Sequence, residues 1–243
     1  IQGYAGAMSI TGTDKENPVK SGIPIADLGA GLYAVIGILS AIQSREKNDS
    51  GEHVDISMLD TQVSLLTYMA TMHFLSGENP EPIGNQHMNH VPFNSYRTLD
   101  GFIQIGVVAE DFWPSLIEAL DLRQLDTEEN KVRIGRLKNR ENIDEALQEV
   151  FITNTTEHWL KILQEHRVPC GPINTLSETF EDADLLKRNM IVEVLQDSGT
   201  SVKMPGNPVK ISNHDEEFRR SPKLGEHTAE IFKNWLNKDI SVD

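Results

Sequence analysis

Length and charge set the first limits on this chain. At 243 residues it can form one large domain or two small ones, each with its own hydrophobic core. The 37 acidic against 22 basic side chains give a net charge of -15, which opposes binding to nucleic acid and to anionic membrane surfaces. The single cysteine, Cys170, excludes an internal disulfide framework and is typical of a reducing compartment, so we expect a cytoplasmic location.

The first block of the chain reads as helix, strand, helix. Residues 23–42 are almost wholly apolar, and a helical period predicts a helix over about 27–45. The stretch is long enough to cross a bilayer, but Pro24 and Asp27 lie within it and no second such span follows, which favours a buried core helix. Alternation over 53–57 predicts a short strand, and residues 59–75 predict a second helix.

The middle of the chain has the composition of a separate domain. Residues 76–91 lack a period and read as a linker, and the Asp100-Gly101 turn predicts a hairpin with a strong strand over 101–108. Helices are expected at 112–120, 143–151 and 155–166, the last of them opened by a capping box of Asn154 and Glu157. Cys170 stands between prolines without an activating neighbour, which favours a structural thiol.

The tail predicts a short helix over 175–189, strands over 191–194, 200–204 and 208–212, and a terminal helix that includes Trp235. Trp113, Trp159 and Trp235 occupy apolar helical positions, so we expect all three in the core. The succession of elements indicates an α/β or α+β chain with a distinct middle domain.

Asp27 is the leading candidate for chemistry. It is the only charged residue between Gly22 and Ser44, and a carboxylate among apolar neighbours is costly unless it is hydrogen-bonded, paired or used in a reaction. The structural alternative is that Asp27 only caps the helix that follows it. Both interpretations remain open from the residues alone.

Two other patterns resemble known sites but lack the context that those sites need. Gly29-x-Gly31-x-x-Ala34 matches a loose dinucleotide fingerprint, yet Pro24 and Asp27 stand where the preceding strand should be. Close backbone packing explains these small residues better. His87 and His90 have a spacing that could suit a metal, but they lie in a linker without further ligands, so we expect no metal site.

Ordered matches along the whole chain resemble the family III CoA-transferases, the group that includes formyl-CoA transferase and the carnitine CoA-transferases. The matching residues are Gln2, Ile25-Ala26-Asp27, Gly31-Leu32-Tyr33, Val54-Asp55, Gly84-Asn85, Pro92-Phe93, Asp100-Gly101, Arg140, Pro169-x-Gly171-Pro172 and Leu224-Gly225-Glu226-His227-Thr228. Single matches of this kind are weak, whereas their density and order together are a strong signal.

The resemblance implies a reaction and a set of site residues. Asp27 would be the nucleophile that attacks an acyl-CoA and then carries CoA as an aspartyl thioester, from which a small carboxylic acid takes it. Gln2, Gly29, Gly31, His87 and His90 are the implied substrate-binding residues. The substrate is a coenzyme A thioester, with no permanently bound cofactor. The family's mobile loop corresponds to residues 85–90, which contain no glycine here.

The resemblance also implies a fold and an assembly. We expect a partial Rossmann-like large domain plus a small α+β domain, in a family III fold that lacks its N-terminal half. Residues 1–72 would be the C-terminal part of the large domain, 73–91 a linker, 92–190 the small domain and 191–243 the return to the large domain. The family forms interlocked homodimers, and most of its CoA contacts come from the absent half, so the isolated chain is expected to be incomplete.

Two alternatives remain beside CoA transfer. The same superfamily includes α-methylacyl-CoA racemases, which use the matching Asp with a His to move a proton at the acyl α-carbon. That His would lie before Ile1, so the chain itself does not contain the deciding residue. A truncated domain that only interacts with other proteins is the third alternative.

Overall fold

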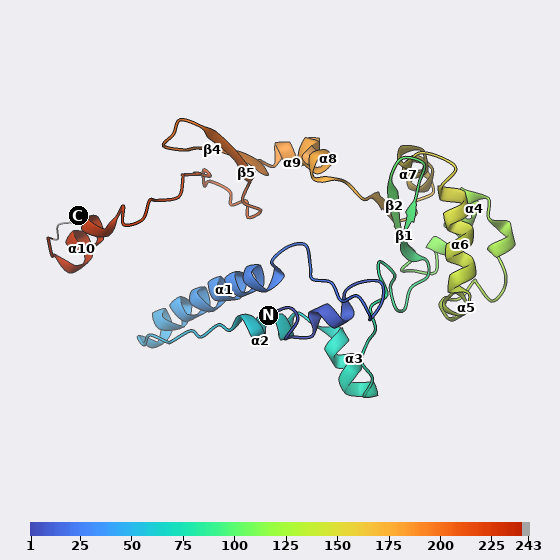
Figure 1. Cartoon of the computed structure of the whole chain (residues 1–243), viewed down its shortest axis with the longest axis horizontal. Coiled ribbons are helices and arrows are strands. Elements are labelled where there is room, and N and C mark those ends of the chain that lie inside the picture. Colours follow the sequence, from blue (N-terminus) through green and yellow to red (C-terminus); the bar gives the residue numbers. More distant parts are fainter. Residues whose placement is uncertain (240–243) are drawn as a thin grey trace. The chain divides into compact units, whose positions relative to one another are not determined.

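The computed structural model describes residues 1–239 and divides into two compact units, one of residues 1–173 and one that begins at Asn174. The elements are shown in Figure 1. Unit 1 contains the helices η1 (Ala7–Ile10), α1 (Ile25–Asn48), α2 (Met58–Ser64), α3 (Tyr68–Ser76), α4 (Phe112–Leu120), η2 (Arg123–Leu125), α5 (Arg133–Lys138), α6 (Arg140–Phe151) and α7 (Thr156–Glu165), and the strands β1 (Phe93–Arg97), β2 (Phe102–Gly106) and β3 (Cys170–Pro172). Unit 2 contains α8 (Leu176–Glu181), α9 (Ala183–Lys187), β4 (Ile191–Leu195), β5 (Ser201–Pro205) and α10 (Thr228–Leu236).

The mixed helix and strand content agrees with the predicted α/β class. Both sheets of the described residues are antiparallel, one of three strands and one of two. The Rossmann-like part of the predicted fold, the absent N-terminal half and the domain boundaries at 72, 91 and 190 stay predictions.

Helix α1 is the longest element, and its ends follow ordinary helix chemistry. It begins directly after Pro24, and its only acidic residue in the first turn is Asp27. At the other end Arg45 and Lys47 lie in the last turn, where positive charge is favoured by the helix dipole. Asp49 adopts the left-handed conformation there, and its N–H donates to the Arg45 carbonyl.

The expectation that this helix is buried in a core is wrong for the chain as described. In its most apolar 18-residue window only 11% of the residues are buried, and Leu32, Ile36 and Leu39 are 67%, 59% and 60% exposed. By length and composition the helix could also cross a membrane. The physical reason for the exposure is that α2 and the segment around Val54 contact one side of α1 and leave the other sides uncovered.

The predicted strand over 53–57 and the single helix over 59–75 are also wrong. Residues 53–57 belong to no strand, and Val54 and Ile56 lie against Gly37 of helix α1 instead of pairing with another strand. The helix is divided into α2 and α3 because Thr67 adopts a φ of 51°, a conformation that a β-branched residue rarely takes. The sequence gives no signal for this break, because residues 59–75 contain neither Gly nor Pro.

The three-stranded sheet of unit 1 confirms the predicted hairpin. Strands β1 and β2 pair antiparallel from Phe93 opposite Gly106 to Arg97 opposite Phe102, on either side of the Asp100-Gly101 turn. Strand β3 adds to β2 and was not predicted; Pro169 precedes it and Pro172 is its last residue. Three residues at a sheet edge tolerate proline, which cannot donate to a ladder.

The hydrophobic core lies between this sheet and helices α4, α6 and α7. Ile103 and Ile105 of β2 are 0% and 1% exposed, whereas Phe102 beside them is 46% exposed, which is the alternation of a strand with one buried face. The predicted core tryptophans of this unit are confirmed. Trp113 is 1% exposed, and Trp159 is 8% exposed with its indole N–H donating to the Phe151 carbonyl over 2.8 Å.

Unit 2 is built from two short helices, a hairpin and a terminal helix. Thr175 and Glu178 form a capping box at the start of α8, and the hairpin pairs Ile191 with Pro205 through to Leu195 with Ser201.

In unit 1, the capping box predicted at Asn154 and Glu157 is wrong. The N-cap of α7 is Thr155, whose hydroxyl accepts a hydrogen bond from the backbone N–H of His158.

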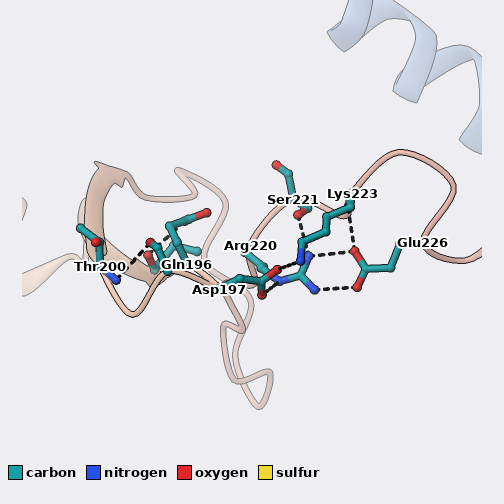
Figure 2. A network of polar contacts seen from close by, with 9 residues as sticks. Gln196, Asp197, Thr200, Arg220, Ser221, Lys223 and Glu226 are labelled. Atoms are coloured by element: carbon teal, nitrogen blue, oxygen red, sulfur yellow. Dashed lines mark hydrogen bonds and ion pairs between the residues drawn. The ribbon is translucent and has the colours of Figure 1, made fainter.

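A network of ion pairs connects the tip of the unit 2 hairpin to the segment before α10 (Figure 2). The Arg220 guanidinium donates to both carboxylate oxygens of Glu226, over 2.6 and 2.8 Å, and it also pairs with Asp197. Lys223 pairs with Asp197 over 2.8 Å, and its backbone N–H donates to Glu226 over 2.6 Å. Arg220 lowers the pKa of Glu226 to about 2.

Two further expectations for the tail are wrong. Residues 208–212 form no strand, since Pro208 lacks an N–H and the N–H of Val209 donates to the Asn207 side chain instead. Trp235 is 82% exposed on α10, because the described residues of unit 2 place nothing over that face of the helix.

Candidate functional site

Asp27 lies in the first turn of α1 with its side chain exposed. Its carboxylate accepts no hydrogen bond from any residue in the described part of the chain, and the N-cap position belongs to Pro24. The capping role weighed from the sequence is therefore absent from this structure. The free N–H groups of a helix start favour a negative charge, so the position suits an ionised and accessible carboxylate.

The glycines after Asp27 explain how α1 comes close to α2. A Cβ atom at Gly29 would lie 3.0 Å from side-chain carbons of both Thr61 and Leu65, so the glycine permits this approach of the two helices. Ala26 and Gly29 are the buried residues of α1. A Cβ at Gly31 would meet nothing within 4 Å, which leaves this position open. Both glycines lie inside a helix with no strand before it, which excludes the dinucleotide fingerprint.

Gln2 contacts the segment that leads into α1. Its side-chain carbonyl oxygen accepts a hydrogen bond from the Ser21 N–H over 2.9 Å, six residues before Asp27. The same N-terminal segment contacts residues much later in the chain, because the Gly84 N–H donates to the Gly12 carbonyl over 2.7 Å. The segment before Asp27 and the loop that carries the two histidines are therefore joined by a backbone hydrogen bond.

His87 and His90 lie together in the loop of residues 84–91, with ring centroids 4.7 Å apart. The His87 ring is also 5.3 Å from the ring of Phe93 at the start of β1. Partial burial, followed by the proximity of His90 and Arg140, lowers the pKa of His87. Its Nδ1 atom accepts the Asn89 N–H over 3.0 Å, so at neutral pH the ring carries its proton on Nε2.

Of the three arginines that hold this loop, the sequence marked only Arg140, as one of the residues that match the family, and gave it no role. Arg133, Arg136 and Arg140 each donate to one of its backbone carbonyls. Their spacing of three and four residues across α5 and α6 is the one signal that could have shown them to share a face.

The candidate residues fall into two groups. Asp27, Gly29 and Gly31 lie on α1 and Gln2 lies on the segment before it, while His87 and His90 lie on the loop. In residues 1–239 no side-chain hydrogen bond or ion pair joins the Asp27 carboxylate to any of the other five. Residues 1–239 also contain no group of three His, Cys, Asp or Glu side chains that could hold a metal ion. Burial raises the pKa of the Cys170 thiol, as expected of a structural cysteine.

Comparison with protein families gives one match that spans nearly all of this arrangement. The model of CoA-transferase family III matches residues 1–228, which include α1, the loop and most of unit 2.

Curated relatives share about 30% of their residues with this chain. Human succinyl-CoA:glutarate CoA-transferase is 30% identical over 237 residues, which are 97% of this chain and 54% of the relative. The acetyl-CoA:oxalate CoA-transferase of Acetobacter aceti is 30% identical over 239 residues, which are 97% of this chain and 60% of the relative. The chain thus spans about half the length of the curated relatives it matches.

Solved structures agree with this result. A CAIB/BAIF family protein from Brucella suis has a TM-score of 0.79 and 31% identity, over 95% of this chain and 60% of that one. A protein from Mycobacterium tuberculosis has the same TM-score at 19% identity, over 93% of this chain and 61% of that one, and supports the fold alone.

Proposed function

Because this chain belongs to CoA-transferase family III, we propose that it forms part of an enzyme that moves CoA from an acyl-CoA donor to a free carboxylic acid. The observation that carries the proposal is the exposed Asp27 carboxylate in the first turn of α1, at the position that the family resemblance assigns to the nucleophile. Hydrogen bonds would restrain and weaken a nucleophilic carboxylate, and none is recorded for Asp27 in the described chain.

The reaction follows from attack by this carboxylate. An Asp27 oxygen adds to the thioester carbonyl, the C–S bond breaks, and a mixed anhydride and CoA thiolate result. The thiolate attacks the aspartyl carbonyl, which releases the donor acid and leaves CoA on Asp27 as a thioester. The acceptor carboxylate attacks this thioester, and the displaced thiolate attacks the acyl carbonyl of the new anhydride. Acyl-CoA leaves, and the Asp27 carboxylate is restored.

The remaining candidates have supporting roles in this proposal. Gln2 orders the segment before Asp27 through Ser21, and Gly29 allows α1 to lie close to α2. His87 and His90 contact the acid substrate from the loop, and Gly31 leaves open space for it on α1. The relatives named above act on glutarate and oxalate, so we propose a small carboxylic acid as acceptor.

We further propose that this chain supplies only part of the complete site. It spans 54% and 60% of the two curated relatives described above, and the apolar side chains of α1 are largely uncovered. In the complete enzyme, the remainder of a family III chain would cover α1 and bind the nucleotide of CoA. Two such chains would form a homodimer, as the resemblance implies.

The test is CoA exchange by the complete protein with Asp27 replaced. We expect Asp27→Ala and Asp27→Asn to lower the rate of CoA transfer from succinyl-CoA to glutarate or oxalate by at least about 1000-fold, because the proposed thioester forms on this carboxylate. In the unmodified protein, hydroxylamine should convert a peptide containing Asp27 to its hydroxamate after incubation with acyl-CoA, as shown by mass spectrometry.

The matched control is Asp184→Asn, which removes another exposed carboxylate from the first turn of a helix, α9. This variant should transfer CoA at the normal rate. Retention of more than a few per cent of exchange by Asp27→Ala would exclude Asp27 as the nucleophile. Deuterium entering the α-carbon of a 2-methylacyl-CoA, without CoA exchange, would support the racemase alternative instead.

A further inference from the structure

The loop of residues 84–91 is held at alternate backbone carbonyls by arginines. Each of three carbonyls accepts a hydrogen bond from a different arginine of α5 or α6. The pairs are His87 O with Arg140 Nη2 at 2.7 Å, Asn89 O with Arg133 Nη1 at 3.2 Å, and Val91 O with Arg136 Nε at 2.8 Å. A hydrogen bond from a charged guanidinium to a carbonyl is stronger than one from a neutral donor, so these three hydrogen bonds fix the course of the loop.

The arginines serve the loop and are not arranged as an anion site. The Arg136 side chain is only 2% exposed, and beyond Val91 it donates to the Asn130 carbonyl and to the Glu110 carboxylate. Its guanidinium lies 5.2 Å from the ring centre of Trp113. Since the side chain is buried and each of its three nitrogens already donates a hydrogen bond, Arg136 cannot also bind a phosphate without breaking contacts in the core.

Arg140 makes a second contact with the loop through the side chain of Gln86. Arg140 Nη1 donates to Gln86 Oε1 over 3.4 Å, and Gln86 Nε2 donates to Asp144 over 3.3 Å. Arg140 and Asp144 stand one turn apart on α6, so they contact opposite ends of one amide. The Tyr96 hydroxyl donates to the other Asp144 oxygen over 2.5 Å and holds this carboxylate in place.

The course of the loop determines which nitrogen of His87 carries the proton. The His87 N–H donates to the Phe93 carbonyl, and two residues later the Asn89 N–H turns back onto His87 Nδ1. The carbonyls of these same two residues, His87 and Asn89, accept hydrogen bonds from Arg140 and Arg133, so the two arginines hold both ends of that contact. With Nδ1 as an acceptor, the neutral ring is left with Nε2–H as its one donor.

We propose that Arg140 is a positioning residue, which holds the loop so that His87 presents its Nε2–H to the carboxylate of the acid substrate. The substrate in this statement rests on the proposed CoA transfer, whereas the dependence of the His87 tautomer on Arg140 does not. The two parts are therefore tested by separate measurements.

The first measurement is the tautomer and the pKa of His87 in the present chain, read from long-range ¹⁵N–¹H correlations by NMR. The unchanged chain should show the Nε2–H form. In Arg140→Met both nitrogen signals should move towards a mixture of tautomers, the pKa of His87 should rise because a nearby positive charge is lost, and amide exchange at residues 86–89 should quicken at least about tenfold.

Two further variants separate positioning from folding. Arg140→Lys keeps the charge but loses one of the two contacts, so its tautomer signals should be intermediate. Gln86→Met removes the contacts of the Gln86 amide with Arg140 and Asp144 but keeps the hydrogen bond from Arg140 to the His87 carbonyl, so it should give a smaller change in the same direction. The control is Arg123→Met, which removes an 89% exposed arginine and should change nothing. A folded Arg140→Met chain with an unaltered His87 tautomer overturns the proposal.

The second measurement uses the complete transferase. Arg140→Met should lower kcat/KM for the acceptor acid at least about tenfold and leave KM for the acyl-CoA within about twofold. A salt-dependent rise of KM for acyl-CoA alone would show an anion-binding role and overturn the proposal. If Asp27→Ala retains activity while the His87 tautomer still depends on Arg140, then the reaction assignment fails and the loop assignment stands.

Discussion

Two carboxylates show how differently the same group is treated within this chain. Asp27 is exposed at a helix start without a recorded hydrogen bond, whereas Glu226 accepts three, two from Arg220 and one from the Lys223 N–H. The first arrangement leaves lone pairs free to react. The second uses the lone pairs for structure, which is the ordinary role of a charged surface residue.

The Glu226 contacts predict a pH dependence of stability. Its pKa is lowered to about 2 from an ordinary value of 4.5, so its ion pair stabilises the folded chain above about pH 4.5 and is lost as the pH falls from there towards 2. We expect Glu226→Gln to destabilise the chain at pH 6 and to lose nearly all of this effect at pH 2. Urea unfolding followed by circular dichroism at both pH values measures this.

The control for this prediction is Glu217→Gln. Glu217 pairs with Arg219 on the surface, with both side chains at least 70% exposed, and such pairs contribute little. An equal effect of the two substitutions at pH 6, or an effect of Glu226→Gln that persists at pH 2, would contradict the assignment.

At the scale of elements, α5 shows why a short helix can matter more than its sequence suggests. Its six residues have no strong apolar period, and Gly135 in the middle is a poor helix former, so the sequence did not predict it. Within this helix Arg136 is buried and holds both Val91 and Asn130. A Cβ at Gly135 would lie 1.7 Å from the Glu129 carbonyl oxygen, so the glycine allows α5 to meet the preceding backbone.

This contact predicts whether Gly135→Ala raises or lowers the free energy of unfolding. Helix propensity alone would make Gly135→Ala stabilising by about 1 kcal/mol, but a methyl group pressed against backbone cannot be relieved by a rotamer change. We expect Gly135→Ala to lower the free energy of unfolding by about 1–3 kcal/mol. Urea titration followed by tryptophan fluorescence reports on it, because Trp113 and Trp159 lie in the adjoining core.

Lys138→Ala, at the exposed end of the same helix, is the comparison and should stay within about 0.5 kcal/mol of the unchanged chain. Gly135→Ala with unchanged or increased stability would show that α5 can move away from Glu129.

At the scale of the whole molecule, α1 is the element of unit 1 whose apolar side chains the rest of that unit leaves uncovered. Apolar side chains project on all sides of it, yet only 11% of its central window is buried. Large exposed apolar surfaces mark contacts with something else. The relatives are nearly twice as long, which fits the proposal that further family III chain covers this helix.

The exposed helix predicts strong binding of the dye ANS by the isolated chain. Replacing Leu32, Ile36 and Leu39 by Gln removes one stripe of α1 and should lower ANS fluorescence at least about twofold. The same number of Gln substitutions at Leu99, Val132 and Leu176, which are exposed singly elsewhere, should have little effect. Equal losses from the two sets would show that α1 is covered in solution, for example by self-association.

Much of the local structure could be predicted from the sequence, because the deciding interactions are local. The apolar period predicted α1, the Asp100-Gly101 turn predicted the β1–β2 hairpin, and the strand expected over 101–108 corresponds to β2. Asp27 was identified as a candidate because a lone charge in an apolar run is visible without coordinates. These signals require only neighbours in the chain.

What the sequence alone could not decide depends on residues far apart in the chain. Residues 53–57 can pair as a strand only if another strand lies beside them, and their neighbour is helix α1. Whether α1 is buried depends on the mass of chain packed around it, and α2 covers only one side. Periodicity describes which face a segment can bury, while tertiary contacts decide whether a partner is present to bury it.

The sequence by itself determined the helix that carries Asp27, the hairpin and the family signature. The tertiary structure alone decided that Asp27 is exposed and uncapped, and that three arginines hold the His87 loop. The physical reason is the distance along the chain over which each interaction acts. Helix and turn signals act over a few residues, whereas a guanidinium of α6 meets the His87 carbonyl across 53 residues of chain, which no local pattern records.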